Sequence, residues 1–141
     1  MQGRDDIIGT RFATVSGPVV YISHFRIKEG REDDWWNSVD QVLPGLEVGK
    51  PRTVFQSFYT NETGATVSIV HVFADSAAMD AHMEGALARA RTAYDYLEPI
   101  GFEVYGEPSE SYLATMRDLP DADALLRVQP KHRAGFSRFP G

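Results

Sequence analysis

The sequence predicts an α+β fold in which two successive βαβ halves of about 45 residues share one sheet. The first observation is that residues 18–107 alternate between runs rich in β-branched and aromatic residues and runs whose apolar residues have helical spacing. The second is that the order of the first half recurs in the second, down to a histidine late in each leading strand, His24 and His71. The length of 141 residues, with 43% hydrophobic residues, is typical of a single domain.

In the first half we expect a strand, a helix and a second strand. Val19–Ile27 is rich in β-branched and aromatic residues, which favours a strand. Apolar residues recur at helical spacing over residues 31–43, and the acidic residues of the first turn suit the positive end of a helix dipole. Pro44 and Gly45 predict the end of that helix. Thr53–Thr60 alternates as the second strand.

In the second half we expect a strand, one long helix and a last strand. Thr66–Phe73 follows a hairpin loop that contains a glycine, and Asp75 or Ser76 caps the helix after it. The apolar stripe of that helix continues for several turns through Met79, Met83, Ala86, Leu87, Ala90, Tyr94 and Leu97. Pro99 is predicted to end the helix, and residues 102–105 form the fourth strand.

We expect these elements to form a ferredoxin-like βαββαβ unit with an antiparallel four-stranded sheet, in which the first and third strands are the central neighbours. Both helices cover one face of that sheet. The other face also carries apolar residues, whichever alternation of the first strand is chosen, and a unit of about 90 residues cannot leave it in water. Two sheets are therefore predicted to pair into a homodimeric barrel of eight strands, with room for side chains or one small ligand.

The two ends of the chain are expected to extend this domain, which spans residues 18–107. Residues 1–17 form an N-terminal extension and residues 108–141 a C-terminal one. The chain up to residue 107 contains 16 acidic and 9 basic residues, whereas residues 126–141 contain four basic residues and no acidic one. We therefore expect the basic, aromatic end of the tail to clasp the acidic body or the partner subunit, with disorder as the alternative.

Composition excludes several classes of protein. The chain has no cysteine, which excludes disulfides, thiolate catalysis and cysteine-bound metal centres. The net charge of -6 argues against a nucleic-acid partner. No apolar run approaches the roughly 20 residues of a membrane span, and the polar residues 1–6 do not resemble a signal peptide. We expect a cytoplasmic protein with no cofactor, no bound metal and no membrane partner.

Three stretches carry a resemblance to a known family. A hydrophobic strand runs into residues 28–30, a second one runs through residues 70–76, and Met79 is followed three residues later by His82 at the start of the second helix. Over about 90 residues the chain resembles the dimeric α+β barrel superfamily and its antibiotic-biosynthesis-monooxygenase-like domains. The resemblance implies a homodimer that oxygenates a small aromatic or polyketide-like substrate without a cofactor.

Other activities occur on this fold and have to be weighed. The resemblance disfavours haem degradation, because Phe25 stands where that branch has an asparagine and no second histidine follows His82 on its helix. The alternative to an enzyme is a non-catalytic, small-ligand-binding or regulatory homodimer of the same fold. An open cavity of about 300 Å³ or more, lined by both strand histidines, favours the enzyme.

The alternation of the strands predicts a catalytic site inside the barrel. We expect His24 and Arg26 to face the barrel, because the opposite choice buries an unpaired arginine under the helices. In the third strand we expect His71 and Phe73 to face the barrel too, since the other row, a serine and two valines, is small enough to lie under a helix. One histidine then acts as general base, and the other, or Arg26, polarises a carbonyl. Alternatively, both histidines are hydrogen-bonded lining of a filled barrel. A metal site is disfavoured, because no carboxylate lies at a fitting position.

Four residues are expected to contact the ligand. Phe55 and Phe73 are predicted to line the barrel, and the resemblance places His82 near the mouth of the pocket. Trp35 and Trp36 cannot both face the core, so we expect one to pack under the sheet and the other to lie at a rim. Trp35 is the fourth candidate contact.

Overall fold

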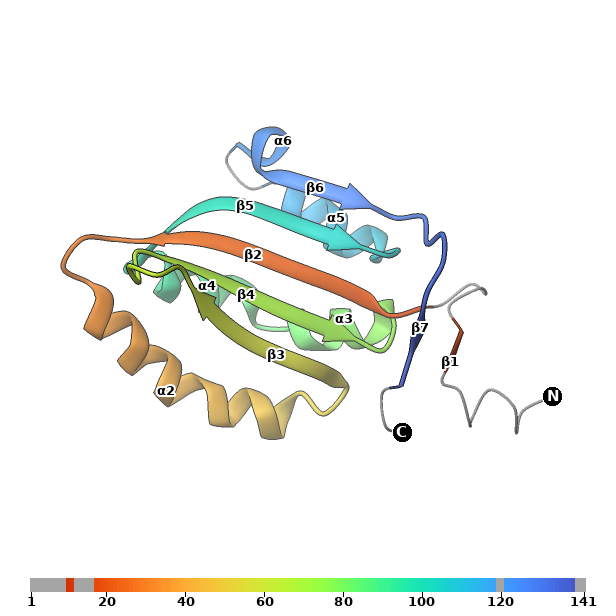
Figure 1. Ribbon diagram of the computed structural model, residues 1–141, viewed down its shortest axis with the longest axis horizontal. Helices are drawn as coiled ribbons and strands as arrows, with labels where there is room; N and C mark the ends of the chain where they lie inside the picture. Colours follow the sequence, from red (N-terminus) through yellow and green to blue (C-terminus); the bar gives the residue numbers. More distant parts are fainter. Residues whose placement is uncertain (1–9, 12–16, 119–120, 139–141) are drawn as a thin grey trace.

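A five-stranded sheet forms the centre of the computed structural model, which describes residues 10–11, 17–118 and 121–138 (Figure 1). The strand order is β3-β4-β2-β5-β6. The strands are β2 (Val19–Ile27), β3 (Thr53–Thr60), β4 (Thr66–Phe73), β5 (Leu97–Tyr105) and β6 (Leu126–Gln129). β2 and β4 are the central neighbours, and the first four strands pair antiparallel. The predicted ferredoxin-like sheet is confirmed, with β6 added at one edge.

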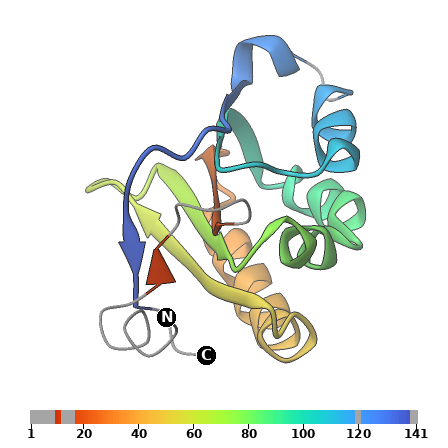
Figure 2. The same cartoon turned by 90° about the vertical axis from the view of Figure 1, so that its right-hand side faces the viewer.

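The helices gather on one face of this sheet (Figure 2). They are α2 (Glu32–Gly49), α3 (Ser76–Met83), α4 (Ala86–Ala93), α5 (Glu110–Arg117) and the short α6 (Ala122–Leu125). A second sheet, made of β1 (Thr10–Arg11) and β7 (Phe136–Ser137), lies on the opposite side. We call the two faces of the large sheet the helix-covered face and the open face.

The alternation of β2 agrees with the prediction. Tyr21 and Phe25 are buried on the helix-covered face, where they belong to the hydrophobic core. His24 and Arg26 lie on the open face, and Arg26 is exposed. A charged side chain thereby stays out of the apolar layer, where burying it without a partner would be costly.

The alternation of β4 is opposite to the prediction. Tyr21 and His71 are direct partners across β2 and β4, and directly opposed residues project to the same face of a sheet. His71 and Phe73 are therefore buried under the helices, and the row that contains Ser68 lies on the open face. The register between the two central strands therefore decides which residues of β4 face the helices, and this register cannot be read from the sequence.

The first helix is longer than predicted. α2 continues through Pro44 and ends at Gly49. Proline inside a helix removes one backbone hydrogen bond. Leu43, just before the proline, packs against the core, and Leu46, after it, remains on the same inner side of the helix, where both leucines line a cavity.

The predicted long second helix is two helices. Asp75 caps α3 as expected, and its carboxylate accepts a hydrogen bond of 2.8 Å from the backbone of Ala78. The helix then breaks at Gly85, which has a φ of 78° and lies in the left-handed region that glycine favours. α4 ends at Ala93, so the prediction that Pro99 terminates a helix is wrong. Pro99 lies within β5 beside a β-bulge, a position at which a sheet tolerates proline.

The first part of the C-terminal extension is integral to the fold. Ser109 caps α5 by accepting a hydrogen bond from the backbone of Tyr112, and Tyr112 and Met116 are buried. α6 then leads into β6, which pairs parallel with β5. Residues 1–9 and 12–16 of the N-terminal extension, and residues 139–141 of the tail, lie outside the described part of the chain. In the part that is described, no helix has the length and apolar character needed to cross a membrane.

Candidate functional site

A cavity of about 460 Å³ lies between the helix-covered face and the helices. Its wall draws on β2, β3, β4 and β5 from the sheet and on α2, α3, α4 and α5 from the helical layer. Most of the wall is apolar or aromatic and includes Phe25, Trp35, Val39, Leu43, Phe58, Ile69, Met83, Tyr94 and Phe102. An apolar cavity with a few convergent polar groups is the usual form of a small-molecule site.

His71 is the most deeply buried polar group of this wall. Its ring stacks on Tyr21, with the centroids 5.3 Å apart, and on Phe73 at 5.8 Å. The side-chain atom Nδ1 is buried, and no described residue hydrogen-bonds to it. Burial lowers the pKa of His71 to about 3, and repulsion from His82 and Arg89 adds to the effect. The imidazole is therefore neutral near pH 7 and can accept a proton or a hydrogen bond from a ligand.

His82 stands beside His71 in the same wall. The two rings meet edge to face with centroids 5.0 Å apart. Nδ1 of His82 shares a hydrogen bond of 2.7 Å with the hydroxyl of Thr53, which fixes the ring orientation. Burial lowers the pKa of His82 to about 4, helped by the positive charges of Arg89 and Lys50. The resemblance implied a place near the pocket mouth, and the structure places this residue, buried, in the cavity wall.

Trp35 adds a second unpaired polar atom. The indole is buried against Trp36 and Phe58 and lines the cavity. Its Nε1–H is buried, and no described residue accepts a hydrogen bond from it. Buried polar groups are nearly always hydrogen-bonded in folded proteins. Trp35 and His71 therefore both line the cavity, and each carries a buried polar atom without a partner among the described residues.

Arg89 completes the site, and the sequence analysis overlooked it. It lies on α4, seven residues after His82, a spacing that puts both residues on one face of the single long helix that the sequence predicts. Nη2 donates to the backbone carbonyl of His82 at 2.7 Å and Nη1 to that of Glu84 at 2.9 Å. These bonds tie α4 to the end of α3 across the break at Gly85.

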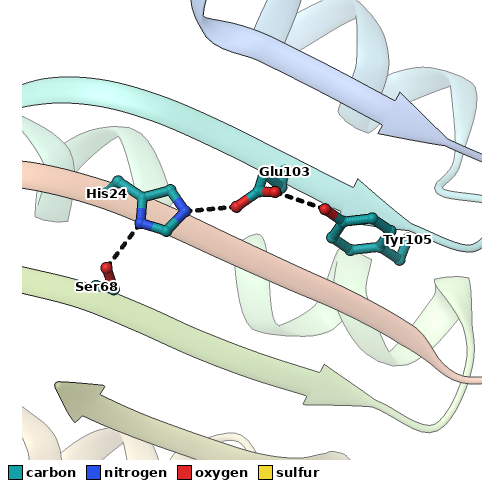
Figure 3. A network of polar contacts seen from close by, with 4 residues as sticks. All are labelled: His24, Ser68, Glu103 and Tyr105. Carbon is teal, nitrogen blue, oxygen red and sulfur yellow. Dashed lines mark hydrogen bonds and ion pairs between the residues drawn. The ribbon is translucent and has the colours of Figure 1, made fainter.

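The open face carries a separate polar network (Figure 3). Nε2 of His24 donates to the Glu103 carboxylate at 2.5 Å, and Nδ1 lies 2.7 Å from the Ser68 hydroxyl. The hydroxyl of Tyr105 donates to the other oxygen of Glu103 at 2.5 Å. Hydrogen bonds from Tyr105 and His24 lower the pKa of Glu103. Arg26, farther along β2, forms an exposed ion pair with Glu98.

The predicted catalytic group is therefore divided between two faces of the sheet. His24 and Arg26 lie on the open face, and His71 lies on the helix-covered face, so the expectation of one shared cavity is wrong. Phe73 does not line the barrel side either: it is fully buried behind the two cavity histidines. Phe55 lies on β3 and is 42% exposed. The described residues contain no group of three or more potential ligands that could hold a metal ion.

The fold is shared with solved structures of low sequence identity. MupZ from Pseudomonas fluorescens matches 86% of this chain and 95% of its own, with a TM-score of 0.62 and 18% identity. SnoaB from Streptomyces nogalater, a cofactor-independent oxygenase, matches 65% of this chain and 94% of its own, with a TM-score of 0.53 and 14% identity. A conserved protein from Methanosarcina mazei Go1 matches 62% of this chain and 90% of its own, with a TM-score of 0.54 and 10% identity.

These likenesses show that the chain shares the α+β fold of MupZ and SnoaB, as we expected from the sequence. No protein-family model matches the sequence. No curated protein matches it either. Because one fold carries many activities, the functional argument rests on the cavity.

Proposed function

We propose that the protein is a cofactor-independent monooxygenase that acts on a small aromatic or polyketide-like phenol in the cavity under the helices. The observation that carries the proposal is that His71 and Trp35 line one apolar cavity, and that Nδ1 of His71 and Nε1 of Trp35 are buried without a partner among the described residues. A ring-shaped ligand can stack against the aromatic wall and pair both atoms at once. The cofactor-independent oxygenase SnoaB, which has the same fold, supports this class of reaction.

The chemistry begins with a proton transfer. His71 Nδ1 accepts the phenolic proton. Because the pKa of His71 is about 3 in the empty cavity, this step requires the phenolate formed beside the imidazolium to raise that pKa. The electron-rich anion reacts with O₂ at a ring carbon. The ring C–H and O–H bonds are broken, one oxygen atom becomes a new carbonyl, and the other leaves as water with the two hydrogens. The conversion of the phenol to a quinone releases four electrons, two for the inserted oxygen atom and two for the second carbonyl. These four electrons reduce O₂ to the level of one carbonyl oxygen and one water. Trp35 donates to the substrate oxygen, and the apolar wall excludes water that would quench the anion.

We further propose that the open face pairs with a second copy of the chain. The face carries the His24–Glu103 network and exposed aromatic residues such as Phe55 and Tyr59, a mixture unusual for a surface left in water. In this arrangement His24 and Arg26 act in assembly. The basic tail clasps the acidic body or the partner. A Val70→Arg substitution in the middle of the open face is then expected to give a monomer in light scattering, and an unchanged mass would contradict the pairing.

Oxygen uptake tests the catalytic proposal. A panel of naphthols and hydroxynaphthoquinones is assayed with an oxygen electrode for the wild type, His71→Gln and His24→Gln. We expect His71→Gln to lose about a hundredfold or more in rate, as is typical for a general base, while His24→Gln retains it. His24→Gln is the matched control because it removes a histidine from the other face of the same sheet.

Two outcomes would contradict the proposal. Equal rates for the wild type and His71→Gln would remove the proposed base. Tight binding of the aromatic compounds without oxygen uptake would instead favour the non-catalytic, ligand-binding homodimer.

A further inference from the structure

The charge of the cavity wall is the feature that the proposed function does not use. Arg89 is a wall residue, and the wall contains no aspartate or glutamate among the described residues. This is unusual for a chain with a net charge of -6. The cavity wall thus carries a positive charge from Arg89 and no negative charge, inside an acidic protein.

The positive charge of Arg89 has no anionic partner in the described part of the chain. Its guanidinium donates to two neutral backbone carbonyls, those of His82 and Glu84. Three other arginines of the described chain do pair with carboxylates: Arg26 with Glu98, Arg31 with Asp34, and Arg52 with Asp75. Arg89 is also partly buried, and burial lowers its pKa. A guanidinium carries more N–H donors than two carbonyls use, so donors remain for a ligand.

The field of Arg89 extends to the polar end of the cavity. Its charge is among the causes that lower the pKa of both His71 and His82. Lys50, whose ammonium donates to the backbone carbonyls of Ala81 and Glu84, adds to the positive potential at His82. Burial, the largest cause of both shifts, disfavours a charge of either sign, so it is the nearby charge of Arg89 that favours an anionic ligand.

We propose that the ligand of this cavity is an aromatic acid whose carboxylate pairs with Arg89. The inference rests on the proposed function in that it assigns the substrate class of the same cavity. The aromatic body lies against the apolar wall, and the phenolic end reaches His71 and Trp35. Arg89 acts as a specificity residue, because a charge-assisted pair in a partly buried site rejects the neutral analogue.

Binding of a matched pair of probes tests the proposal. 2-Naphthoate and its neutral counterpart 2-naphthamide are titrated by calorimetry into the full-length wild type, Arg89→Gln, Arg89→Lys and Arg91→Gln. Arg91 is an exposed residue of the same helix outside the cavity wall and serves as the matched control.

We expect the wild type and Arg91→Gln to bind naphthoate at least about tenfold more tightly than naphthamide, the size typical of one charged hydrogen bond. Arg89→Gln is expected to lose this preference while its affinity for naphthamide stays within about twofold. Arg89→Lys keeps the charge and is expected to retain part of the preference.

Three results would overturn the proposal. The first is a wild type that shows no preference, because it binds both probes equally or binds neither. The second is a preference for naphthoate that survives in Arg89→Gln. The third is an equal loss of affinity for both probes in Arg89→Gln. The last result would assign Arg89 only the role of joining α3 to α4. Failure of the oxygenase proposal is distinct, because absence of oxygen uptake would leave the carboxylate preference measurable. Loss of the preference would equally leave oxygen uptake of neutral phenols intact.

Discussion

Acidification is expected to destabilise the protein through the two buried histidines of the cavity. In the folded state the pKa of His71 is about 3 and that of His82 about 4, whereas a histidine in the unfolded chain has a pKa of 6.5. Below pH 6.5 the unfolded chain therefore binds more protons than the folded protein, and the free energy of unfolding decreases as the pH falls. This contribution to stability is fully present above pH 6.5 and is lost progressively as the pH approaches 4 and then 3.

The size of the effect follows from the distance between these pKa values. Between pH 7 and pH 5, each histidine lowers the free energy of unfolding by about 2 kcal/mol, so the two together lower it by about 4 kcal/mol. Urea denaturation at pH 7 and pH 5 measures it, with His71→Gln compared with the wild type. The variant is expected to lose about 2 kcal/mol less than the wild type between the two pH values, because glutamine does not titrate.

The reasoning is refuted if His71→Gln loses as much stability on acidification as the wild type does, since His71 would then be titrating normally in the folded state.

Five further substitutions test core packing, backbone conformation and helix capping, each by urea denaturation at pH 7. Phe73→Ala removes a fully buried ring that stacks on His71 and is expected to cost about 4 kcal/mol, and a cost under 1 kcal/mol would contradict its role in the core. Gly106→Ala is expected to cost about 2 kcal/mol or more, because φ is 104° and the new Cβ would lie 2.9 Å from the carbonyl of Pro18. Gly45→Ala is its counterpart within α2, where nothing lies within 4 Å, and a gain of about 0.5 to 1 kcal/mol is expected, so equal effects at the two glycines would be inconsistent with this account. Asp75→Ala removes the cap of α3 and is expected to cost about 1 kcal/mol, whereas Asp75→Asn, which keeps an acceptor, should cost less.

The cavity shows why a correct fold prediction led to a wrong site. The alternation of β2 could be chosen from the sequence, because only one choice keeps Arg26 out of the apolar layer. β4 offers no such marker, since one row contains small residues and the other contains a histidine. The small row looked suited to packing beneath a helix. In the structure that row lies on the open face, and His71 lies among Tyr21, Phe73 and His82 on the helix-covered face.

Features that depend on neighbours along the chain could be predicted from the sequence. The bounds of β2, β3 and β4, the cap at Asp75 and the order βαββαβ follow from alternation, helical spacing and capping chemistry. Two helix ends were predicted wrongly for the same reason: a proline or an apolar stripe in the sequence does not by itself decide where a helix ends. α2 does not end at Pro44 but continues to Gly49. The predicted second helix is interrupted at Gly85, although its apolar stripe continues past that residue.

Only the tertiary structure decided where the chemistry lies. The register between β2 and β4 pairs Tyr21 with His71, and a shift by one residue would move every side chain of β4 to the other face. That pairing separates His71 from His24, and the break at Gly85 brings Arg89 against the end of α3. Register and helix packing join residues distant in sequence, so no pattern along the chain could place the cavity beneath the helices.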